Sequence, residues 1–324
     1  MKVAVTGASG HIGYAVINTL LERGLTPRVF IHKNNPFEGN KNVEVVRGSM
    51  LQKDDLKNLL EGCTHLIHCA AMVSIGGDKS GDIYTANVEG LRNVMEVALE
   101  TKIKRMVHLS TVHVYDISSV ELLTEEAPYI PDHKAILYEK SKRDGQILAL
   151  EYARRGLDIV LLNPTSVYGV PDISGSRQNQ AVWDLYRNKY PFLFRGGYDW
   201  VDVNDVSEAA ANALQMGRTG EAYLLSGKYM TLKELSYAVA SVKGSKIPAI
   251  ELPVWMVRSG VPFVKLYAKA MGNEPLLSHD AIDILLNSPK NISSIKAQKD
   301  LNFRIRPETE TIKGIIEHYN NQRR

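Results

Sequence analysis

Short apolar runs alternate with longer amphipathic stretches along the first half of the chain. Six runs rich in Val, Ile and Leu predict buried strands at 2–6, 28–32, 43–47, 65–69, 105–110 and 158–163. Between them, apolar residues recur at helical spacing over 11–23, 54–61, 87–101 and 138–155. This alternation predicts an α/β fold with a parallel, doubly wound sheet, whose ligand crevice lies beyond the carboxyl ends of the strands.

The pattern loosens after about residue 165 into loops rich in Pro and Gly, with further helices expected at 205–216 and 231–243. Aromatic residues gather here at Trp183, Tyr186, Tyr190, Phe192, Phe194, Tyr198 and Trp200. Trp183 and Trp200 either line a pocket or pack in a core. We expect residues 1–165 to form a Rossmann-type domain, to which later segments return, and residues 166–324 to be mainly a smaller substrate-binding cap.

Composition places the chain among soluble globular proteins, with 324 residues, 44% hydrophobic and 23% charged. The net charge of +3 is spread along the chain, so it indicates neither nucleic acid nor an anionic membrane as a partner. Met1 leads directly into a strand, which leaves no room for a signal peptide, and the apolar stretch 252–267 contains Arg258 and Lys265. Cys63 and Cys69 cannot form a disulfide framework. We expect a cytoplasmic protein with no membrane span.

A glycine-rich turn follows the first predicted strand, in TGASGHIG at 6–13. Gly7, Gly10 and Gly13 are spaced so that backbone N–H groups can approach a phosphate at the start of a helix. Ordinary turns also produce such spacing. If the turn binds a dinucleotide, we expect the cofactor to contact the three glycines together with Ser9, His11 and Ile12.

A candidate for proton transfer follows the fifth predicted strand. LSTVHVY stands at 109–115, and Tyr138 and Lys142 lie four residues apart in a predicted helix, so that phenol and ammonium share one face. A neighbouring cation lowers the pKa of a phenol, which makes it a usable proton donor and acceptor. Thr111 could hold a substrate oxygen beside it. Such a Tyr and Lys pair is also commonplace on exposed helices.

Six ordered motifs resemble those of the extended short-chain dehydrogenase/reductase family, which includes the NAD-dependent epimerases and dehydratases. They are TGxxGxxG at 6–13, HCAA at 68–71, NVEG at 87–90, ST followed by VY at 110–115, YxxxK at 138–142 and NPTSVYG at 163–169, with a weaker match in DWVDVNDV at 199–206. The resemblance implies Tyr138 as general acid and base, Lys142 on the nicotinamide ribose and Thr111 orienting the substrate carbonyl. It gives Asn87 either a supporting or a purely structural role.

The same resemblance suggests which cofactor binds. Family members that prefer NAD carry an acidic residue at the end of the second strand, where this chain has His32 and Lys33. An imidazole and an ammonium suit the 2′-phosphate of NADP(H), so we expect NADP(H) to be preferred and NAD(H) to be possible, unless the two residues only cap a solvated strand end. Ser49 departs from the usual Asp. Further expected cofactor contacts are Ser49, Met50, Cys69, Ala70, Ala71, Leu109, Asn163, Pro164, Thr165 and Val167.

The reaction class is narrowed by two departures from family patterns. Sugar dehydratases carry Asp-Glu after the catalytic Thr, where this chain has Val112 and His113, and sugar epimerases carry an Arg at the position of Tyr198. The pattern is most similar to the dihydroflavonol reductase-like and 3β-hydroxysteroid dehydrogenase branch, which implies an oxidoreductase that interconverts a ketone and a secondary alcohol on a lipophilic small molecule. Alternatives are a nucleotide-sugar epimerase with tightly bound cofactor and a redox sensor that binds NADP without turnover. Candidate substrate residues are Val73, His113, Trp183 and Tyr198.

No metal site is predicted, since His65 and His68 are three apart in a strand and leave opposite faces. The family pairs the helices near 87–101 and 138–155 of two subunits, which makes a homodimer possible. The apolar positions that would serve it, or would instead pack on the sheet, are Val94, Val97, Ala98, Ile147, Leu148 and Leu150.

Overall fold

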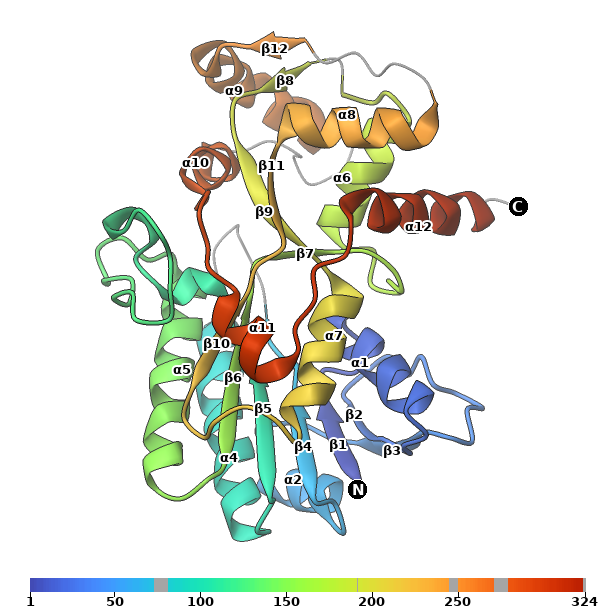
Figure 1. The fold of residues 1–324 in the computed structure, drawn as a ribbon, viewed down its shortest axis with the longest axis vertical. Helices are drawn as coiled ribbons and strands as arrows, with labels where there is room; N and C mark the ends of the chain where they lie inside the picture. Colours follow the sequence, from blue (N-terminus) through green and yellow to red (C-terminus); the bar gives the residue numbers. More distant parts are fainter. Residues whose placement is uncertain (73–80, 191, 245–249, 271–278, 323–324) are drawn as a thin grey trace.

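The computed structural model describes residues 1–72, 81–190, 192–244, 250–270 and 279–322. Its lower lobe is built on a seven-stranded sheet in the order β10-β6-β5-β4-β1-β2-β3 (Figure 1). Every neighbouring pair is parallel, so the predicted doubly wound sheet is confirmed. The strands are β1 (Val3–Thr6), β2 (Arg28–Ile31), β3 (Glu44–Arg47), β4 (His65–His68), β5 (Arg105–Leu109), β6 (Ile159–Pro164) and β10 (Ala222–Leu225).

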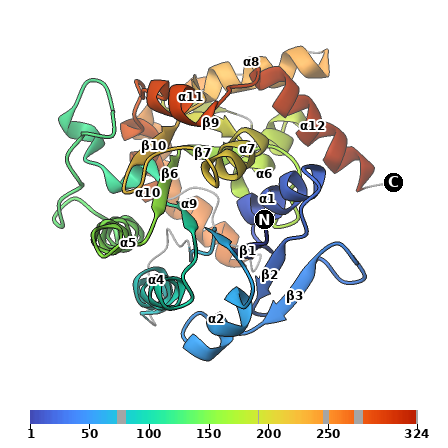
Figure 2. The ribbon, with the colours of Figure 1, turned by 60° about the horizontal axis from the view of Figure 1, so that its bottom comes forward.

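Helices cover both faces of this sheet (Figure 2). One face carries α2 (Lys53–Leu60), α4 (Leu91–Glu100) and α5 (Leu137–Arg154), and the other carries α1 (His11–Glu22), α7 (Val203–Ala213) and α11 (Ile295–Leu301). Alternate residues of β1 enter opposite cores: Val3 and Val5 pack on the α1 side, and Ala4 packs on the α2 side. Burial on both faces explains why the inner strands read as continuous apolar runs, whereas β3 at the edge is partly exposed.

Short helical segments lead into α4 and α5. The predicted helix at 87–101 begins earlier, as α3 (Asp82–Tyr84) and a π-helical turn (Thr85–Gly90) that runs directly into α4. After β5 the chain forms two 3₁₀ turns, Val112–Val114 and Ile117–Ser119, before it reaches α5. Both irregular regions lie between a strand end and a helix, where a ligand crevice is expected.

Segments from the second half of the chain return to the lower lobe. Strand β10 pairs with β6 at the edge of the sheet, and α11 packs against β10. Helix α7 packs on α1, where the Thr19 and Ser207 hydroxyls are hydrogen-bonded at 2.8 Å. Residues after 165 therefore contribute to both lobes.

The upper lobe is built from smaller sheets and aromatic side chains. Its sheets are β11-β9-β7 and β12-β8, and α12 packs on α6 and α8. Trp183 and Trp200 are each 4% exposed, and the Trp183 ring stacks on Tyr186 and Tyr319 at 5.3 and 5.2 Å, so both tryptophans pack in a core. The elements are β7 (Ser166–Tyr168), α6 (Arg177–Tyr186), β8 (Leu193–Phe194), β9 (Gly197–Asp202), β11 (Lys228–Thr231), α8 (Leu232–Lys243), β12 (Glu251–Leu252), α9 (Val254–Ala270), α10 (His279–Asn287) and α12 (Glu308–Asn321).

The apolar positions considered for a dimer mostly face the sheet. Val94, Val97, Ala98 and Leu148 are buried in the core between the sheet and its helices. Ile147 is the outward residue of this group, with 37% of its surface exposed. Among the described helices, none combines the length and apolar character that a bilayer-spanning segment requires.

Candidate active site

The glycine-rich turn after β1 is a close-packed piece of backbone. Gly7 has φ +70°, and a Cβ on it would lie 2.5 Å from the backbone nitrogen of Ala70, which follows β4. A Cβ on Gly13 would lie 2.1 Å from the Gly7 carbonyl oxygen. Since Cβ atoms do not approach backbone so closely, these two positions require glycine. The turn is thereby held between the start of α1 and the chain leaving β4.

The start of α1 fits a diphosphate group. The helix follows Gly10, no side chain caps it, and its first turn contains no acidic residue. Its backbone N–H groups and the positive end of its dipole are thus available to an anion. Around this turn Ser9 is exposed, Ile12 packs against the core, and His11 Nε2 lies 2.9 Å from the Gly169 carbonyl oxygen.

Basic side chains gather where β2 and β3 end. His32 and Lys33 are exposed directly after Ile31, and the parallel register places Arg47 of β3 opposite Ile31. The Arg47 guanidinium donates a hydrogen bond to the Lys33 carbonyl at 3.3 Å. Arg47 was missed in the sequence, although the shared carboxyl end of two parallel strands could have indicated it. The two predicted residues and Arg47 together form a cationic surface suited to a phosphate.

Ser49 stands where the family usually has an Asp, and the carboxylate of a different residue lies beside it. Asp55, in the first turn of α2, accepts a hydrogen bond from the Ser49 backbone N–H at 2.9 Å through Oδ2. Asp55 was not predicted. The next residue, Met50, accepts a hydrogen bond from Asn93 Nδ2 at 3.1 Å, which ties this loop to α4. An acid therefore lies next to residue 49 although the family's Asp is absent from it.

The three predicted catalytic residues meet above the carboxyl end of β5. Thr111 and Lys142 are buried, Tyr138 is half-buried, and the Thr111 side chain lies near enough to the Tyr138 phenol to lower its pKa. Lys142 Nζ donates to the Leu109 carbonyl at 2.9 Å. A hydroxyl, a phenol and an ammonium group are thus collected from the end of one strand and one face of α5.

Burial dominates the electrostatics of this group. It raises the pKa of the Tyr138 phenol to about 12, and the Thr111 side chain offsets only part of that increase. Burial also lowers the pKa of the Lys142 ammonium to about 8. The expectation that Lys142 lowers the pKa of Tyr138 is therefore wrong for this structure. The ammonium donates instead to the Leu109 carbonyl, and desolvation of the phenolate is the largest effect.

Asn87 connects two segments of the site. Its Oδ1 accepts from the Met72 N–H at 2.7 Å, and its Nδ2 donates to the Met72 carbonyl at 3.0 Å and to the Ser141 hydroxyl at 3.0 Å. Ser141 in turn donates to the Tyr138 carbonyl at 2.7 Å. Asn87 thus fixes the start of α5 relative to the chain after β4, and this position lies in the π-helical turn.

A buried amide pair holds the backbone of Thr111. Asn163 Nδ2 donates to the Thr111 carbonyl and to Gln146 Oε1, both at 2.8 Å. Gln146 Nε2 donates to the Tyr115 hydroxyl at 3.3 Å. Gln146 was not predicted, although it lies four residues after Lys142 and therefore on the same face of α5.

The other predicted cofactor contacts lie at the carboxyl ends of β4 and β6. Cys69 donates through its backbone N–H to the Thr6 carbonyl at 3.1 Å, and burial raises the pKa of its thiol to about 12. Ala70 and Ala71 follow it toward the glycine turn. At the other strand, Pro164 ends β6 and Thr165 donates to the Leu225 carbonyl, with Val167 in β7.

The candidate substrate residues do not form one cluster. His113 Nδ1 lies 3.4 Å from Glu139 Oε1, next to Tyr138, and is partly exposed. Tyr198 is half-buried with its ring edge-on to Trp200, and Trp183 lies in the aromatic core. Val73 lies outside the described residues. Of the described candidates, His113 is thus the one beside the catalytic group.

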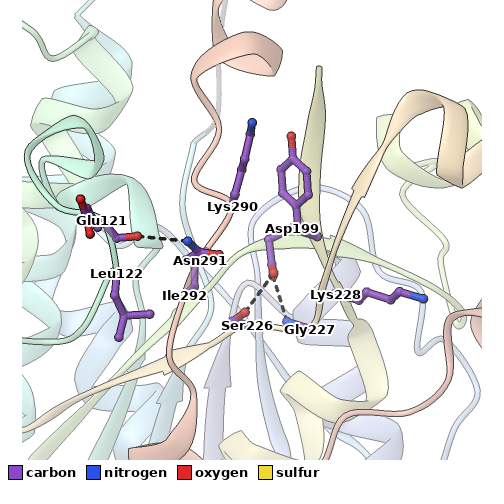
Figure 3. Close-up of a pocket in the computed structure, with 10 residues that line it drawn as sticks. Glu121, Leu122, Asp199, Ser226, Gly227, Lys228, Lys290, Asn291 and Ile292 are labelled. Atoms are coloured by element: carbon purple, nitrogen blue, oxygen red, sulfur yellow. Dashed lines mark hydrogen bonds between the residues drawn. The ribbon is translucent and has the colours of Figure 1, made fainter. Parts of the chain in front are cut away.

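A cavity of about 560 Å³ lies above the carboxyl end of β10 (Figure 3). Asp199 accepts hydrogen bonds there from the Ser226 hydroxyl at 3.0 Å and the Gly227 N–H at 2.9 Å. The lining carries charges of both signs and contains none of the predicted site residues: Glu121, Leu122, Asp199, Ser226, Gly227, Lys228, Tyr229, Lys290, Asn291 and Ile292. This cavity is therefore not the apolar pocket that a lipophilic substrate requires.

The fold and the arrangement of the glycine turn, strand ends and Tyr-Lys helix agree with one family of proteins. The model of the NAD dependent epimerase/dehydratase family matches residues 3–226. The chain belongs to this family. Curated members similar to it include reductases and dehydrogenases as well as sugar dehydratases. The resemblance inferred from the motifs is thus confirmed.

Three similar proteins illustrate the match to this family. The chain is 27% identical to sterol demethylase protein B of Methylococcus capsulatus over 306 residues, which covers 93% of each chain. It is 27% identical over 285 residues to a putative dihydroflavonol 4-reductase of Synechocystis, covering 86% of this chain and 83% of that one. The crystal structure of gox2253 superposes with a TM-score of 0.82 at 28% identity, covering 99% of this chain and 98% of the other.

Proposed function

We propose that the protein is an NADP(H)-dependent oxidoreductase that interconverts a ketone and a secondary alcohol on a lipophilic small molecule. The observation that carries this proposal is the meeting of Thr111, Tyr138 and Lys142 above β5. A hydroxyl and a phenol that lie near each other provide two hydrogen-bonding groups for one substrate oxygen, and a buried ammonium lies on the same helix face as the phenol.

In this proposal each side chain has one task at the reacting oxygen. When bound, the nicotinamide cofactor supplies or accepts the hydride. Thr111 donates a hydrogen bond to the substrate oxygen, and Tyr138 gives it a proton during reduction and takes the proton back during oxidation. A phenol whose pKa is about 12 keeps its proton at neutral pH and is thus ready to donate. Asn87 and Asn163 act indirectly, since they position α5 and Thr111.

Cofactor preference in the proposal rests on the basic group after β2 and β3. His32, Lys33 and Arg47 would hold the 2′-phosphate of NADP(H), and the uncapped start of α1 would hold the diphosphate. Charge-assisted hydrogen bonds to phosphate contribute more than neutral ones. We therefore propose NADP(H) ahead of NAD(H).

A lipophilic substrate is supported because two residue types that sugar dehydratases and epimerases carry are replaced in this chain. Val112 is buried, so the position of the first dehydratase acid is occupied by a core side chain. Tyr198 packs on Trp200 where an epimerase carries its Arg. The names of two relatives refer to a sterol and to dihydroflavonol, which are lipophilic compounds. We propose a flat, apolar ketone or alcohol of that kind.

The test is NADPH consumption across a panel of steroid-like and flavonoid-like ketones, with nucleotide sugars as the competing class. Tyr138→Phe is expected to reduce turnover by roughly two to four orders of magnitude while NADPH affinity and melting temperature change little. Tyr190→Phe is the matched control, since Tyr190 is a half-buried tyrosine of the upper lobe, and its turnover should equal that of the parent protein. Epimerisation consumes no net NADPH, so the nucleotide sugars are analysed by separating the sugar epimers. Conversion of nucleotide sugars alone identifies an epimerase, and NADPH binding without any turnover identifies a redox sensor.

We further propose that the protein is cytoplasmic and forms a homodimer. Cys63 and Cys69 are both free thiols, which supports a reducing compartment such as the cytoplasm. A homodimer through α4 and α5 would use Ile147, the outward apolar residue of the group considered. Light scattering at micromolar protein concentration is expected to give a dimeric mass that Ile147→Glu lowers, and a monomeric mass for the parent protein contradicts the dimer.

A further inference from the structure

The top of the upper lobe exposes a set of large apolar side chains. Strands β8 and β12 and helices α8 and α9 meet there (Figure 1). Five residues form what we call the apical patch, with these exposed fractions: Phe192 38%, Tyr237 55%, Ile250 63%, Trp255 69% and Met256 42%. Single exposed apolar residues are ordinary on protein surfaces, whereas several large ones on adjoining elements indicate a binding surface.

Direct contacts join the elements that carry the apical patch. The Leu193 N–H donates to the Ile250 carbonyl at 2.7 Å, which places Phe192 and Ile250 on neighbouring chain segments. Lys233 of α8 forms an ion pair with Glu251 of β12 at 3.2 Å. Helix α9 begins at Val254, directly after β12 and Pro253. The five side chains thus come from one connected part of the lobe.

Helix α9 divides its side chains between core and solvent. Val257 and Val261 are buried with Phe194 and Ile282, and this contact holds the helix to the lobe. Trp255 and Met256 are exposed beside them and are not part of that core. Among the described residues none covers these two side chains, so their large apolar surface is exposed there.

Positive charge gathers at the same end of the molecule. Segments 187–196, 232–244 and 250–262 contain six Lys or Arg residues and two Asp or Glu residues. Asp184 of α6 and Asp283 of α10 form ion pairs with Lys189 and Arg258, so the three segments together with these two partners carry a net charge of about +2. Arg195 is exposed and forms no ion pair within the described part of the chain. The segments that carry the apical patch thus have a small excess of positive charge.

We propose that the apical patch binds the surface of an anionic phospholipid bilayer. Trp255, Met256 and Ile250 enter the boundary between headgroups and acyl chains, and Arg195 with its basic neighbours contacts the phosphates. A helix with apolar residues outward and basic residues nearby binds in the plane of the interface without crossing it. The inference rests on and deepens the proposed function, because a lipophilic ketone partitions into membranes and would reach the enzyme there.

Tryptophan fluorescence gives a direct test, because the chain has three tryptophans and Trp183 and Trp200 are buried. A change on lipid binding therefore reports Trp255. With vesicles of equal parts phosphatidylcholine and phosphatidylglycerol we expect cosedimentation, a blue shift and quenching by brominated acyl chains. Vesicles of phosphatidylcholine alone, or high salt, should weaken binding tenfold or more, since the attraction to anionic headgroups is screened or removed.

Variants distinguish lipid binding by the apical patch from non-specific adsorption of the protein to vesicles. Trp255→Ser with Met256→Ser should weaken vesicle binding by tenfold or more, as expected when large apolar side chains no longer enter the interface. Ile295→Ser is the matched control, since Ile295 is 70% exposed on α11 in the lower lobe, and it should bind as the parent does. Arg195→Glu should weaken vesicle binding. Lys104→Glu is the matched control and should not, because Lys104 is exposed in the lower lobe, directly before β5.

Two results overturn the proposal. One is absence of binding to mixed vesicles, or binding that the patch variants leave unchanged. The other is a dimer in light scattering that Trp255→Ser abolishes, because a second copy of the chain then covers the patch. Vesicle binding is measured without substrate, so a protein that reduces soluble ketones but ignores vesicles refutes this inference alone. A protein that binds vesicles but reduces no ketone refutes the proposed function alone.

Discussion

The two lobes of the molecule are built by different means. In the lower lobe the candidate site for the cofactor diphosphate is made of backbone: a Cβ on Gly7 or Gly13 would lie within 2.5 Å of a backbone atom, and α1 presents its uncapped N–H groups. In the upper lobe the structure depends on side chains, with Trp183 stacked between Tyr186 and Tyr319. We therefore expect the lower lobe to be sensitive to added atoms and the upper lobe to removed ones.

The largest expected effect is on the upper lobe. Trp183→Ala removes a buried ring from its stack and should cost about 3 to 5 kcal/mol in the free energy of unfolding. NADPH affinity should be unchanged at a temperature where the variant is folded, because the glycine turn lies in the other lobe. Thermal unfolding and a fluorescence titration of NADPH measure the two quantities.

Trp255→Ala is the control for that experiment, since it deletes the same side chain where it is 69% exposed. Its stability should stay within about 0.5 kcal/mol of the parent. Loss of NADPH affinity in Trp183→Ala at unchanged stability would contradict the separation of the two lobes.

The reverse experiment adds one carbon to the lower lobe. Gly13→Ala places a Cβ 2.1 Å from the Gly7 carbonyl oxygen, so the turn must move, at an expected cost of about 1 to 3 kcal/mol in stability and a tenfold or greater loss of NADPH affinity. Isothermal titration calorimetry and thermal unfolding measure both.

A glycine of the upper lobe provides the matched control. Gly260 lies in α9, and a Cβ on it meets nothing within 4 Å, so Gly260→Ala should be neutral or stabilising by up to about 1 kcal/mol. Equal behaviour of the two glycine variants would contradict the distinction between a backbone-built and a side-chain-built lobe.

The lower lobe is also expected to lose stability in acid. His68 is buried with its Nδ1 2.8 Å from the Thr6 hydroxyl, and burial lowers its pKa from 6.5 to about 3. The folded protein keeps the ring neutral while the unfolded chain protonates it, so this contribution is complete above about pH 6.5 and is lost as the pH falls toward 3. The loss should reach about 1.4 kcal/mol per pH unit.

Denaturant unfolding at pH 7.5 and pH 5.5 tests the histidine contribution. The difference in stability between the two should shrink in His68→Asn and persist in His133→Asn, whose parent side chain is exposed. An identical pH dependence in the parent and in His68→Asn would show that His68 is not the group responsible.

The smallest expected effect concerns cofactor choice. Arg47→Ala should weaken NADPH binding by about tenfold, as expected for one charge-assisted contact, and leave NADH binding almost unchanged. Lys41→Ala, in the loop before β3, is the control of equal charge and should change neither affinity. If Arg47→Ala weakens both cofactors equally, the residue supports the loop and does not select the 2′-phosphate.

Much of the lower lobe could be predicted because its signals are local. The predicted strand at 65–69 is β4, and the predicted helix at 138–155 is α5, since alternating apolar runs and helical spacing both lie within short windows. The meeting of Thr111 with Tyr138 and Lys142 also follows from strand order. Arg47, Asp55 and Gln146 were not predicted, because each joins the site through a neighbouring strand or helix that no short window includes.

The sequence alone determined the parallel sheet, the glycine turn and the spacing that puts Tyr138 and Lys142 on one helix face, because each depends on residues close together in the chain. The pKa of Tyr138 depends on the folded chain, because burial raises it although the neighbouring cation in the sequence predicted a lower value. The tertiary structure alone also gathered basic and apolar residues at the apical patch. Burial and surface charge depend on which distant segments become neighbours, and a linear pattern does not contain that information.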